Sequence, residues 1–149
     1  MSLKLLVVDD EAFNLEILAY YLGRRGFDVV SAEDGALALQ RLEDSPEIDG
    51  IVLDRMMPNM DGMEFLARIK ADERFKDVPV IMQTAAAARE RVLEGIKAGV
   101  YHYLTKPYEP EVLLAIVNSA LDNAKVRKAL KEENSQAPAQ PWFNDAILL

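Results

Sequence analysis

The strongest constraint on the fold is a set of five short, mostly apolar runs that are separated by longer segments of helical periodicity. The runs are residues 5–8, 28–32, 50–54, 78–84 and 101–105. Strands that alternate apolar and polar residues are typical of sheets with one face in water, whereas continuously apolar strands are buried on both faces. The pattern therefore predicts a parallel sheet that is covered by helices on each side.

The segments between these runs carry helix signals. Apolar residues recur at helical spacing in 14–25, 34–44, 63–71 and 85–98, and Pro110 opens a fifth helix where helices accept proline. A strand–helix unit repeated five times is (βα)5, and the right-handed crossover rule leaves few arrangements for it. We predict a doubly wound α/β sandwich of the flavodoxin-like type, with a parallel five-stranded sheet of order 2-1-3-4-5.

Charged residues follow three of the apolar runs directly. Asp9 and Asp10 end the first run, Asp54 ends the third, and Lys106 follows the fifth. The predicted order sets strands 1 and 3 side by side, so the three carboxylates would share one crevice at the carboxyl edge of the sheet. Two carboxylates about 5 Å apart repel by roughly 3 kcal/mol at an effective dielectric of about 20. The cluster therefore favours a divalent cation such as Mg²⁺, although each carboxylate taken singly could instead cap a helix or a turn.

The composition excludes several other classes of protein. The 149 residues are 50% hydrophobic, include no Cys, and carry a net charge of −8 from 17 basic and 25 acidic residues. Without Cys there is no disulfide framework and no thiolate metal site. The acidic balance argues against nucleic-acid binding as the main role. No apolar run approaches the roughly 20 residues that span a bilayer, and no signal peptide is evident, so we expect a cytoplasmic protein without membrane contact.

Four motifs around these charged residues resemble the receiver domain of two-component response regulators. They are Val7–Glu11, Leu53–Gly62, Thr84-Ala85 and Leu104–Tyr108. The resemblance runs from about residue 4 to about residue 121 and implies a phosphorylation-activated signalling switch rather than an enzyme. Such a domain takes a phosphoryl group from the phosphohistidine of a sensor histidine kinase or a phosphotransfer protein. Its own chemistry is limited to self-phosphorylation and autodephosphorylation.

The resemblance implies an acceptor and a set of metal ligands. Asp54 would accept the phosphoryl group, with Mg²⁺ as the cofactor. Asp10, Asp54 and the backbone carbonyl of Met56 would hold Mg²⁺ directly, and Asp9 would act mainly through a metal-bound water. A phosphoryl group adds about two negative charges and three strong acceptor oxygens, which agrees with a nearby cation and lysine.

The resemblance also implies three residues that respond to the phosphoryl group. Lys106 would pair with a phosphoryl oxygen, and its bond to Pro107 would be cis. Thr84 would donate its hydroxyl to the phosphoryl group, and Tyr103 would change rotamer with that movement. The result would be a changed surface on the fourth helix, the fifth strand and the fifth helix. Without the resemblance, Thr84 is also an ordinary β-branched strand residue and Tyr103 is ordinary half-buried packing.

Three positions depart from the usual pattern of the family. Gln83 stands where an apolar strand residue is common. Met56 and Ala86 carry no group that could orient a water along its path to an aspartyl phosphate. We expect these two residues to influence the lifetime of the phosphorylated state.

The fifth helix is predicted to continue past the receiver-like region. Leu114, Val117, Leu121 and Ala124 form one apolar stripe, and neither Gly nor Pro interrupts residues 122–134. We divide the chain into a receiver domain at 1–124, a helical extension at 125–136, and a linker or tail at 137–149 that would suit docking or the start of an output region. The extension and the surface named above are the two candidate sites of a homodimer.

Three other classes of protein share part of this pattern. An aspartyl-nucleophile phosphatase has Asp-x-Asp at the first strand end, where this chain has Asp9-Asp10-Glu11. A flavin-binding flavodoxin shares the fold, but the acidic loop after the first strand would repel a phosphate that lacks a metal. A scaffold that works without phosphorylation would not need the complete set of charged residues, so the receiver interpretation is favoured.

Overall fold

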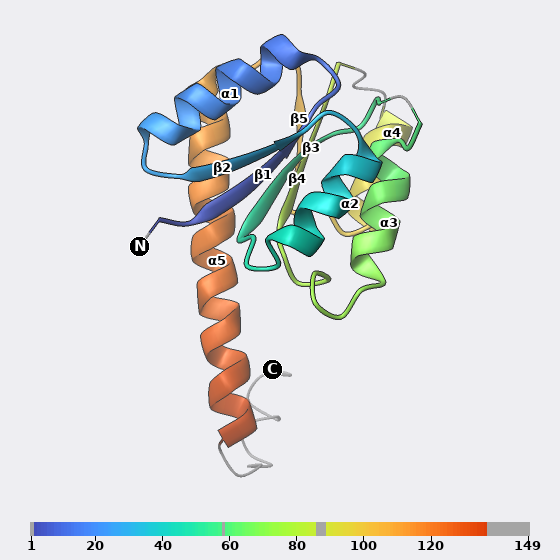
Figure 1. Ribbon diagram of the computed structural model, residues 1–149. Coiled ribbons are helices and arrows are strands. Elements are labelled where there is room, and N and C mark those ends of the chain that lie inside the picture. The colour runs from blue at the N-terminus through green and yellow to red at the C-terminus, as the bar shows by residue number, and fades with distance from the viewer. Residues whose placement is uncertain (1, 58, 86–88, 137–149) are drawn as a thin grey trace.

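A five-stranded parallel sheet forms the centre of the molecule (Figure 1). The computed structural model describes residues 2–57, 59–85 and 89–136, without the side chains of Arg89 and residues 131–136. The sheet has the order β2-β1-β3-β4-β5, which confirms the predicted fold class. The strands are β1 (Lys4–Val8), β2 (Asp28–Ala32), β3 (Gly50–Asp54), β4 (Val80–Thr84) and β5 (His102–Thr105).

In the described part of the chain, five helices cover the sheet in two layers. They are α1 (Ala12–Arg24), α2 (Gly35–Asp44), α3 (Gly62–Lys70), α4 (Arg89–Lys97) and α5 (Pro110–Gln136). Figure 1 shows α1 and α5 on one side of the sheet and α2, α3 and α4 on the other. Two separate apolar clusters match these layers, one that joins the sheet to α1 and α5 and one that joins it to α2 and α3. Every residue of β3 and β4 is buried, as continuously apolar strands require.

Two of the helix starts explain how the loops at the carboxyl edge of the sheet are shaped. The side chain of Asp34 accepts a hydrogen bond from the Leu37 amide at 2.7 Å and caps α2. Asp61 caps α3 in the same way through the Glu64 amide at 2.9 Å. Asp61 ends the loop that follows β3, so its hydrogen bond fixes where this loop enters α3.

The fourth strand begins later than predicted, and the predicted start of the fourth helix is only partly described. The strand begins at Val80 rather than Val78, because Pro79 has no amide hydrogen to pair and offers only its carbonyl, to the amide of Ile51 at 3.0 Å. The described part of α4 begins at Arg89, and residues 86–88 lie outside the described residues.

The apolar face of α5 differs from the predicted stripe. Leu113, Val117, Ala120 and Leu121 are buried against the sheet, whereas Leu114 is only half-buried. These residues belong to the core, so they do not form an exposed surface of the fifth helix. The helix itself continues to Gln136, and Figure 1 shows its last turns extending beyond the sheet. The tail at 137–149 lies outside the described residues.

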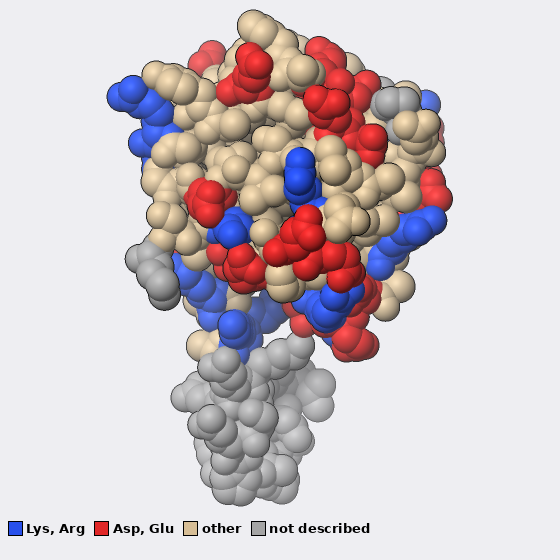
Figure 2. Space-filling view, viewed as in Figure 1, with Lys and Arg blue, Asp and Glu red and all other residues tan. Residues whose placement is uncertain are grey.

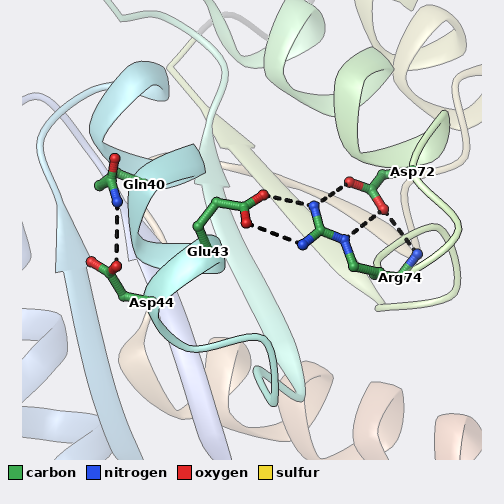
Figure 3. A network of polar contacts seen from close by, with 5 residues as sticks. All are labelled: Gln40, Glu43, Asp44, Asp72 and Arg74. Carbon is green, nitrogen blue, oxygen red and sulfur yellow. Dashed lines mark hydrogen bonds and ion pairs between the residues drawn. The ribbon is translucent and has the colours of Figure 1, made fainter.

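An ion-pair network links α2 to the loop between α3 and β4 (Figure 3). The Arg74 guanidinium contacts the carboxylate of Glu43 at 2.6 Å and that of Asp72 at 2.8 Å. On α2, the side chain of Gln40 donates to Asp44 at 3.3 Å. Arg74 and Glu43 are about half exposed, so water and salt screen this network and it adds little to the stability of the fold.

Candidate functional site

Three carboxylates converge at the carboxyl edge of the sheet. β1 and β3 are neighbours, so Asp9 and Asp10 after β1 lie beside Asp54 at the end of β3. One carboxylate oxygen from each of the three residues lies within 4.8 Å of the others. Asp9 is fully buried and Asp54 is 5% exposed, whereas Asp10 faces solvent. The structure therefore brings together the acidic residues that the sequence placed at two separate strand ends.

Lys106 contacts two of these carboxylates. Its ammonium lies 3.2 Å from Oδ2 of Asp9 and 3.4 Å from Oδ2 of Asp54. The peptide bond between Lys106 and Pro107 is cis, as the resemblance implied. Burial opposes the charge on the ammonium, but the carboxylates of Asp54 and Asp9 outweigh it and raise the pKa of Lys106. The lysine is thus a fixed positive charge over the two buried acids.

The ionised form of Asp54 is costly in this environment. Burial is the largest cause, and together with the Asp9 carboxylate it raises the pKa of Asp54 to about 6, although Lys106 and the Met56 amide oppose the shift. The Met56 amide donates to Oδ1 of Asp54 at 3.2 Å, and the Glu11 amide donates to Oδ1 of Asp9 at 2.9 Å. The loops after β1 and β3 therefore orient both carboxylates through backbone donors.

The donor set fits a hard divalent cation. If all three acids are ionised, they and Lys106 carry a net charge of −2, since three negative charges are offset by one positive charge. The available ligand atoms are carboxylate oxygens, which Mg²⁺ prefers, and exposed Asp10 leaves room for the waters that Mg²⁺ retains. A cation of charge +2 would neutralise the cluster.

The two residues that the resemblance linked to switching lie on the neighbouring strands. Thr84 is fully buried at the end of β4, and its carbonyl accepts from the Lys106 amide at 2.8 Å. Tyr103 on β5 is half-buried and packs directly on α4. A Cβ at Gly95 would lie only 2.7 Å from the ring of Tyr103, so the ring occupies space that a larger residue on α4 would fill.

Arg55 is a residue at this site that the sequence analysis missed. It follows Asp54 directly and is 8% exposed. Its guanidinium donates to the Arg91 carbonyl at 2.9 Å, to Glu94 at 2.6 Å and to the Tyr103 hydroxyl at 3.4 Å. These contacts join the loop after β3 to α4 and β5. A basic residue after a buried strand is ordinary in a sequence, and its partners are 36 to 48 positions away, so only the tertiary structure shows its role.

The positions that departed from the family pattern have different surroundings. Gln83 is fully buried, donates to Oδ2 of Asp9 at 3.4 Å, and accepts from the hydroxyl of Tyr108. Met56 is 55% exposed, and its sulfur accepts from the guanidinium of Arg91 at 3.7 Å. Ala86 lies outside the described residues.

A cavity of about 430 Å³ opens beside the charged cluster. Asp9, Gln83, Lys106 and Tyr108 form part of its wall, and Ile17 of α1 forms another part. Ile17 is 43% exposed. The cavity therefore borders the carboxylate of Asp9 on the α1 side. On the face shown in Figure 2, acidic and basic side chains are interspersed, with several acidic side chains along the edge where the site loops lie in Figure 1.

Comparison with known proteins decides the family. The family model for the response regulator receiver domain matches residues 5–118. The chain belongs to the response regulator receiver family. Chemotaxis protein CheY1 of Helicobacter pylori strain J99 is 38% identical over 112 residues, which is 74% of this chain and 90% of that protein. The phosphate regulon transcriptional regulatory protein PhoB of Escherichia coli K12 is 36% identical over 121 residues, covering 81% of this chain and 52% of PhoB.

Solved receiver structures show the same fold. The chemotaxis protein CheY4 of Vibrio cholerae superposes with a TM-score of 0.76 at 31% identity, over 80% of this chain and 99% of CheY4. A CheY-like receiver domain protein of Methanospirillum hungatei gives a TM-score of 0.79 at 25% identity, over 85% and 99% of the two chains.

Membership of the family fixes the general role of the chain. Receiver domains are the signalling switches of two-component systems rather than enzymes, and histidine kinases or phosphotransfer proteins phosphorylate them. They bind Mg²⁺ at an acidic pocket, and in this chain Asp9, Asp10 and Asp54 form a group of three neighbouring carboxylates. Within the described residues, no helix has the length and apolar character to cross a membrane.

Proposed function

We propose that this receiver domain is switched by phosphorylation of Asp54, with the phosphohistidine of a sensor histidine kinase or phosphotransfer protein as donor. The observation that supports this most is that Asp54 ends a central strand beside two more carboxylates and 3.4 Å from the Lys106 ammonium. A carboxylate oxygen of Asp54 attacks phosphorus, the P–N bond to the donor histidine breaks, and the imidazole leaves with the bonding electrons.

A divalent cation bound at this acidic cluster would offset the repulsion that opposes this attack. Asp10, Asp54 and the carbonyl of Met56 would hold Mg²⁺, and Asp9 would act through a metal-bound water. Both oxygens of Asp9 already accept hydrogen bonds, from Glu11 on one side and from Gln83 and Lys106 on the other, which supports this indirect role. When bound, Mg²⁺ supplies positive charge for the oxygens of the incoming phosphoryl group. Lys106 pairs with one of those oxygens.

The signal leaves through the face formed by α4, β5 and α5. Thr84 turns its hydroxyl to the phosphoryl group and Tyr103 changes rotamer with it. A tenfold shift between two conformations needs only about 1.4 kcal/mol of differential interaction, which one charge-assisted hydrogen bond can supply. Leu93 and Ile96 of α4 and Val112 of α5 are exposed on the output side and would contact a partner or a second copy of the chain.

The extension of α5 is the alternative surface for a homodimer. Val126 and Leu130 are 59% and 53% exposed at a spacing of four residues, so they share one face of the helix. Sedimentation of the phosphorylated and unphosphorylated protein, with Leu93→Glu and Val126→Glu as the two variants, separates these surfaces. The variant that prevents association identifies the interface.

Labelling with a small phosphodonor tests the proposed acceptor. After incubation with acetyl phosphate and Mg²⁺, we expect mass spectrometry to find one phosphoryl adduct per chain and peptide mapping to place it on Asp54. A chelator present from the start should suppress the adduct. An adduct on another residue, or equal labelling without a divalent cation, would contradict the proposal.

The raised pKa of Asp54 predicts a pH-dependent effect of Mg²⁺. The pKa is about 6 in the folded protein against 3.8 for a free Asp, so the folded state holds this proton more tightly than the unfolded state. The stability that this bound proton gives to the metal-free protein is fully present below about pH 4. It is lost as the pH rises through 6, and the total loss is about 3 kcal/mol at most. Mg²⁺ binds the ionised form, so its stabilising effect should grow over the same range.

Thermal unfolding between pH 4 and pH 7, with and without millimolar Mg²⁺, measures this effect. Asp10→Asn is the matched variant, because it removes one exposed carboxylate and leaves the two buried acids in place. We expect the increase in melting temperature with Mg²⁺ to shrink in that variant. A melting temperature of the parent protein that ignores Mg²⁺ at pH 7 would show that the cluster does not bind the metal.

Replacement of Arg55 by Met should loosen α4 without preventing phosphorylation. The change removes the donor to the Arg91 carbonyl, to Glu94 and to Tyr103, but keeps an unbranched apolar side chain in place of the arginine stem. Hydrogen bonds to charged groups are worth about 1.5–3 kcal/mol, so amide exchange in α4 should become at least about tenfold faster. The response of α4 to beryllofluoride, a phosphoryl mimic, should also diminish.

Arg68→Met is the control for this change. Arg68 lies on α3 and forms an exposed pair with Glu64 at 3.6 Å, so its loss removes a charge of the same kind without touching α4. In the Arg68→Met variant, the amide exchange rates in α4 should match those of the parent protein. If Arg55→Met and Arg68→Met behave alike, Arg55 does not couple the loop after β3 to the output face.

A further inference from the structure

Gln83 is a buried carboxamide near the carboxyl end of β4. It lies on β4, opposite Asp54 of β3 and Leu104 of β5, and it is fully excluded from solvent. Polar groups buried in this way are costly unless they are hydrogen-bonded. The proposed steps of phosphorylation do not use Gln83, so the partners of its amide indicate its role.

The two ends of the amide have partners of opposite kinds. The NH₂ group donates to Oδ2 of Asp9 at 3.4 Å, and the carbonyl oxygen accepts from the hydroxyl of Tyr108. The reversed amide would set its carbonyl oxygen against the carboxylate of Asp9, where two acceptors would repel. The negative charge on Asp9 therefore selects this orientation, and the orientation in turn makes the Tyr108 hydroxyl a donor.

Tyr108 keeps its proton at neutral pH. Burial, with smaller contributions from the carboxylates of Asp9 and Asp54, raises the pKa of Tyr108 to about 12. Tyr108 and Lys106 belong to the same loop after β5. This loop therefore holds Asp9 in two ways, directly through the Lys106 ammonium at 3.2 Å and indirectly through the hydroxyl of Tyr108 and the amide of Gln83.

We infer that Gln83 and Tyr108 are positioning residues for Mg²⁺, because their hydrogen-bonded chain fixes the carboxylate of Asp9. With Glu11 and Lys106, Gln83 completes a set of three donors around Asp9, which leaves that carboxylate one orientation toward the metal and its waters. Loss of a hydrogen-bond partner of a metal-binding side chain typically weakens metal affinity by about 10- to 100-fold. The inference rests on the proposed Mg²⁺ site and adds two residues outside it.

Three variants test the chain of hydrogen bonds. Gln83→Met keeps the volume of the side chain and removes both polar ends, Tyr108→Phe keeps the ring and removes the hydroxyl, and the third variant combines them. Mg²⁺ affinity is measured by following the amide resonances of Glu11 and Met56 during titration. We expect each single variant to bind Mg²⁺ about tenfold more weakly, the lower end of the range for such partners. Because both act on Asp9 through one path, the double variant should lose little more than Gln83→Met alone.

A second measurement distinguishes positioning from a general effect on the fold. In the metal-free protein, the side-chain carboxyl ¹³C resonance of Asp9 should shift in Gln83→Met and in Tyr108→Phe. Tyr101→Phe is the control, because it removes a hydroxyl that contacts Ser119 and Asn123 at the other end of β5. That variant should leave both the Asp9 resonance and the Mg²⁺ affinity unchanged.

The outcomes separate this inference from the proposed function. Folded variants that bind Mg²⁺ as tightly as the parent, or losses that add in the double variant, would overturn the positioning role while the metal site stands. A parent protein that binds no Mg²⁺ would overturn both. Should Gln83→Met fail to fold, Tyr108→Phe still decides the matter, because it removes one hydroxyl from the wall of an open cavity and leaves the packing of the ring intact.

Discussion

Asp54→Asn is expected to abolish phosphoryl labelling and to leave the domain folded. The amide has nearly the shape of the carboxylate, but its oxygen and nitrogen are poor nucleophiles toward phosphorus. The fold should tolerate the change because burial already disfavours the charged form of Asp54, whose pKa is about 6, and because Lys106 retains Asp9 at 3.2 Å. Labelling by acetyl phosphate and the melting temperature at pH 7 measure the two parts of this expectation.

Asp34→Asn is a suitable control for that experiment. Asp34 caps α2 through the Leu37 amide, and Asn is an equally good capping residue, so this variant should fold and become labelled like the parent. Labelling of Asp54→Asn at the rate of the parent would place the acceptor elsewhere. If the Asp54→Asn variant both loses labelling and unfolds, the result would show that Asp54 is needed for the fold, and the prediction that the domain stays folded would be wrong.

The sequence predicted the sheet and the charged cluster because both depend on short-range signals. Apolar runs mark strands buried on two faces, and parallel strands end at one edge whatever the details of packing. Asp9, Asp10, Asp54 and Lys106 each follow such a run directly, so their convergence follows from the strand order alone. No knowledge of side-chain contacts was needed to place them together.

The contacts around that cluster could not be predicted in the same way. Arg55 reaches α4 and β5, and Gln83 reaches Asp9 across 74 positions of the chain. Such partners depend on rotamers and on the distance between packed elements, neither of which has a periodic signal. The sequence shows Gln83 only as a polar residue in an apolar strand, and its partners Asp9 and Tyr108 are evident only in the fold.

The core face of α5 shows where periodicity is ambiguous. Leu113 and Leu114 are adjacent, so each can start an apolar series at spacings of three and four residues that includes Val117 and Leu121. The structure selects Leu113, which is fully buried, and with it Ala120. The two choices differ by about 100° around the helix, and only the fit of the side chains against the sheet decides between them.

Gly62→Ala should disrupt the loop that carries the acceptor. A Cβ at Gly62 would lie 2.6 Å from the carbonyl oxygen of Asp54 and 2.8 Å from the Cα of Arg55, both of which are backbone atoms. The Gly62 amide also donates to the Arg55 carbonyl at 2.8 Å, so α3 starts in direct contact with the end of β3. Forcing this backbone apart should cost about 1–3 kcal/mol of stability, measured by denaturant unfolding. It should also slow labelling of Asp54, because the carboxylate moves with its own carbonyl.

Gly23→Ala on α1 is the matched change for this prediction. A Cβ at Gly23 meets no atom within 4 Å, and alanine is a better helix former by about 1 kcal/mol, so this variant should be more stable than the parent and should become labelled at the same rate. The same chemical substitution then has opposite signs at two helical glycines. If both variants are stabilised, α3 does not press on the loop after β3. If Gly62→Ala loses stability but keeps the full rate of labelling, the position of Asp54 does not depend on that contact.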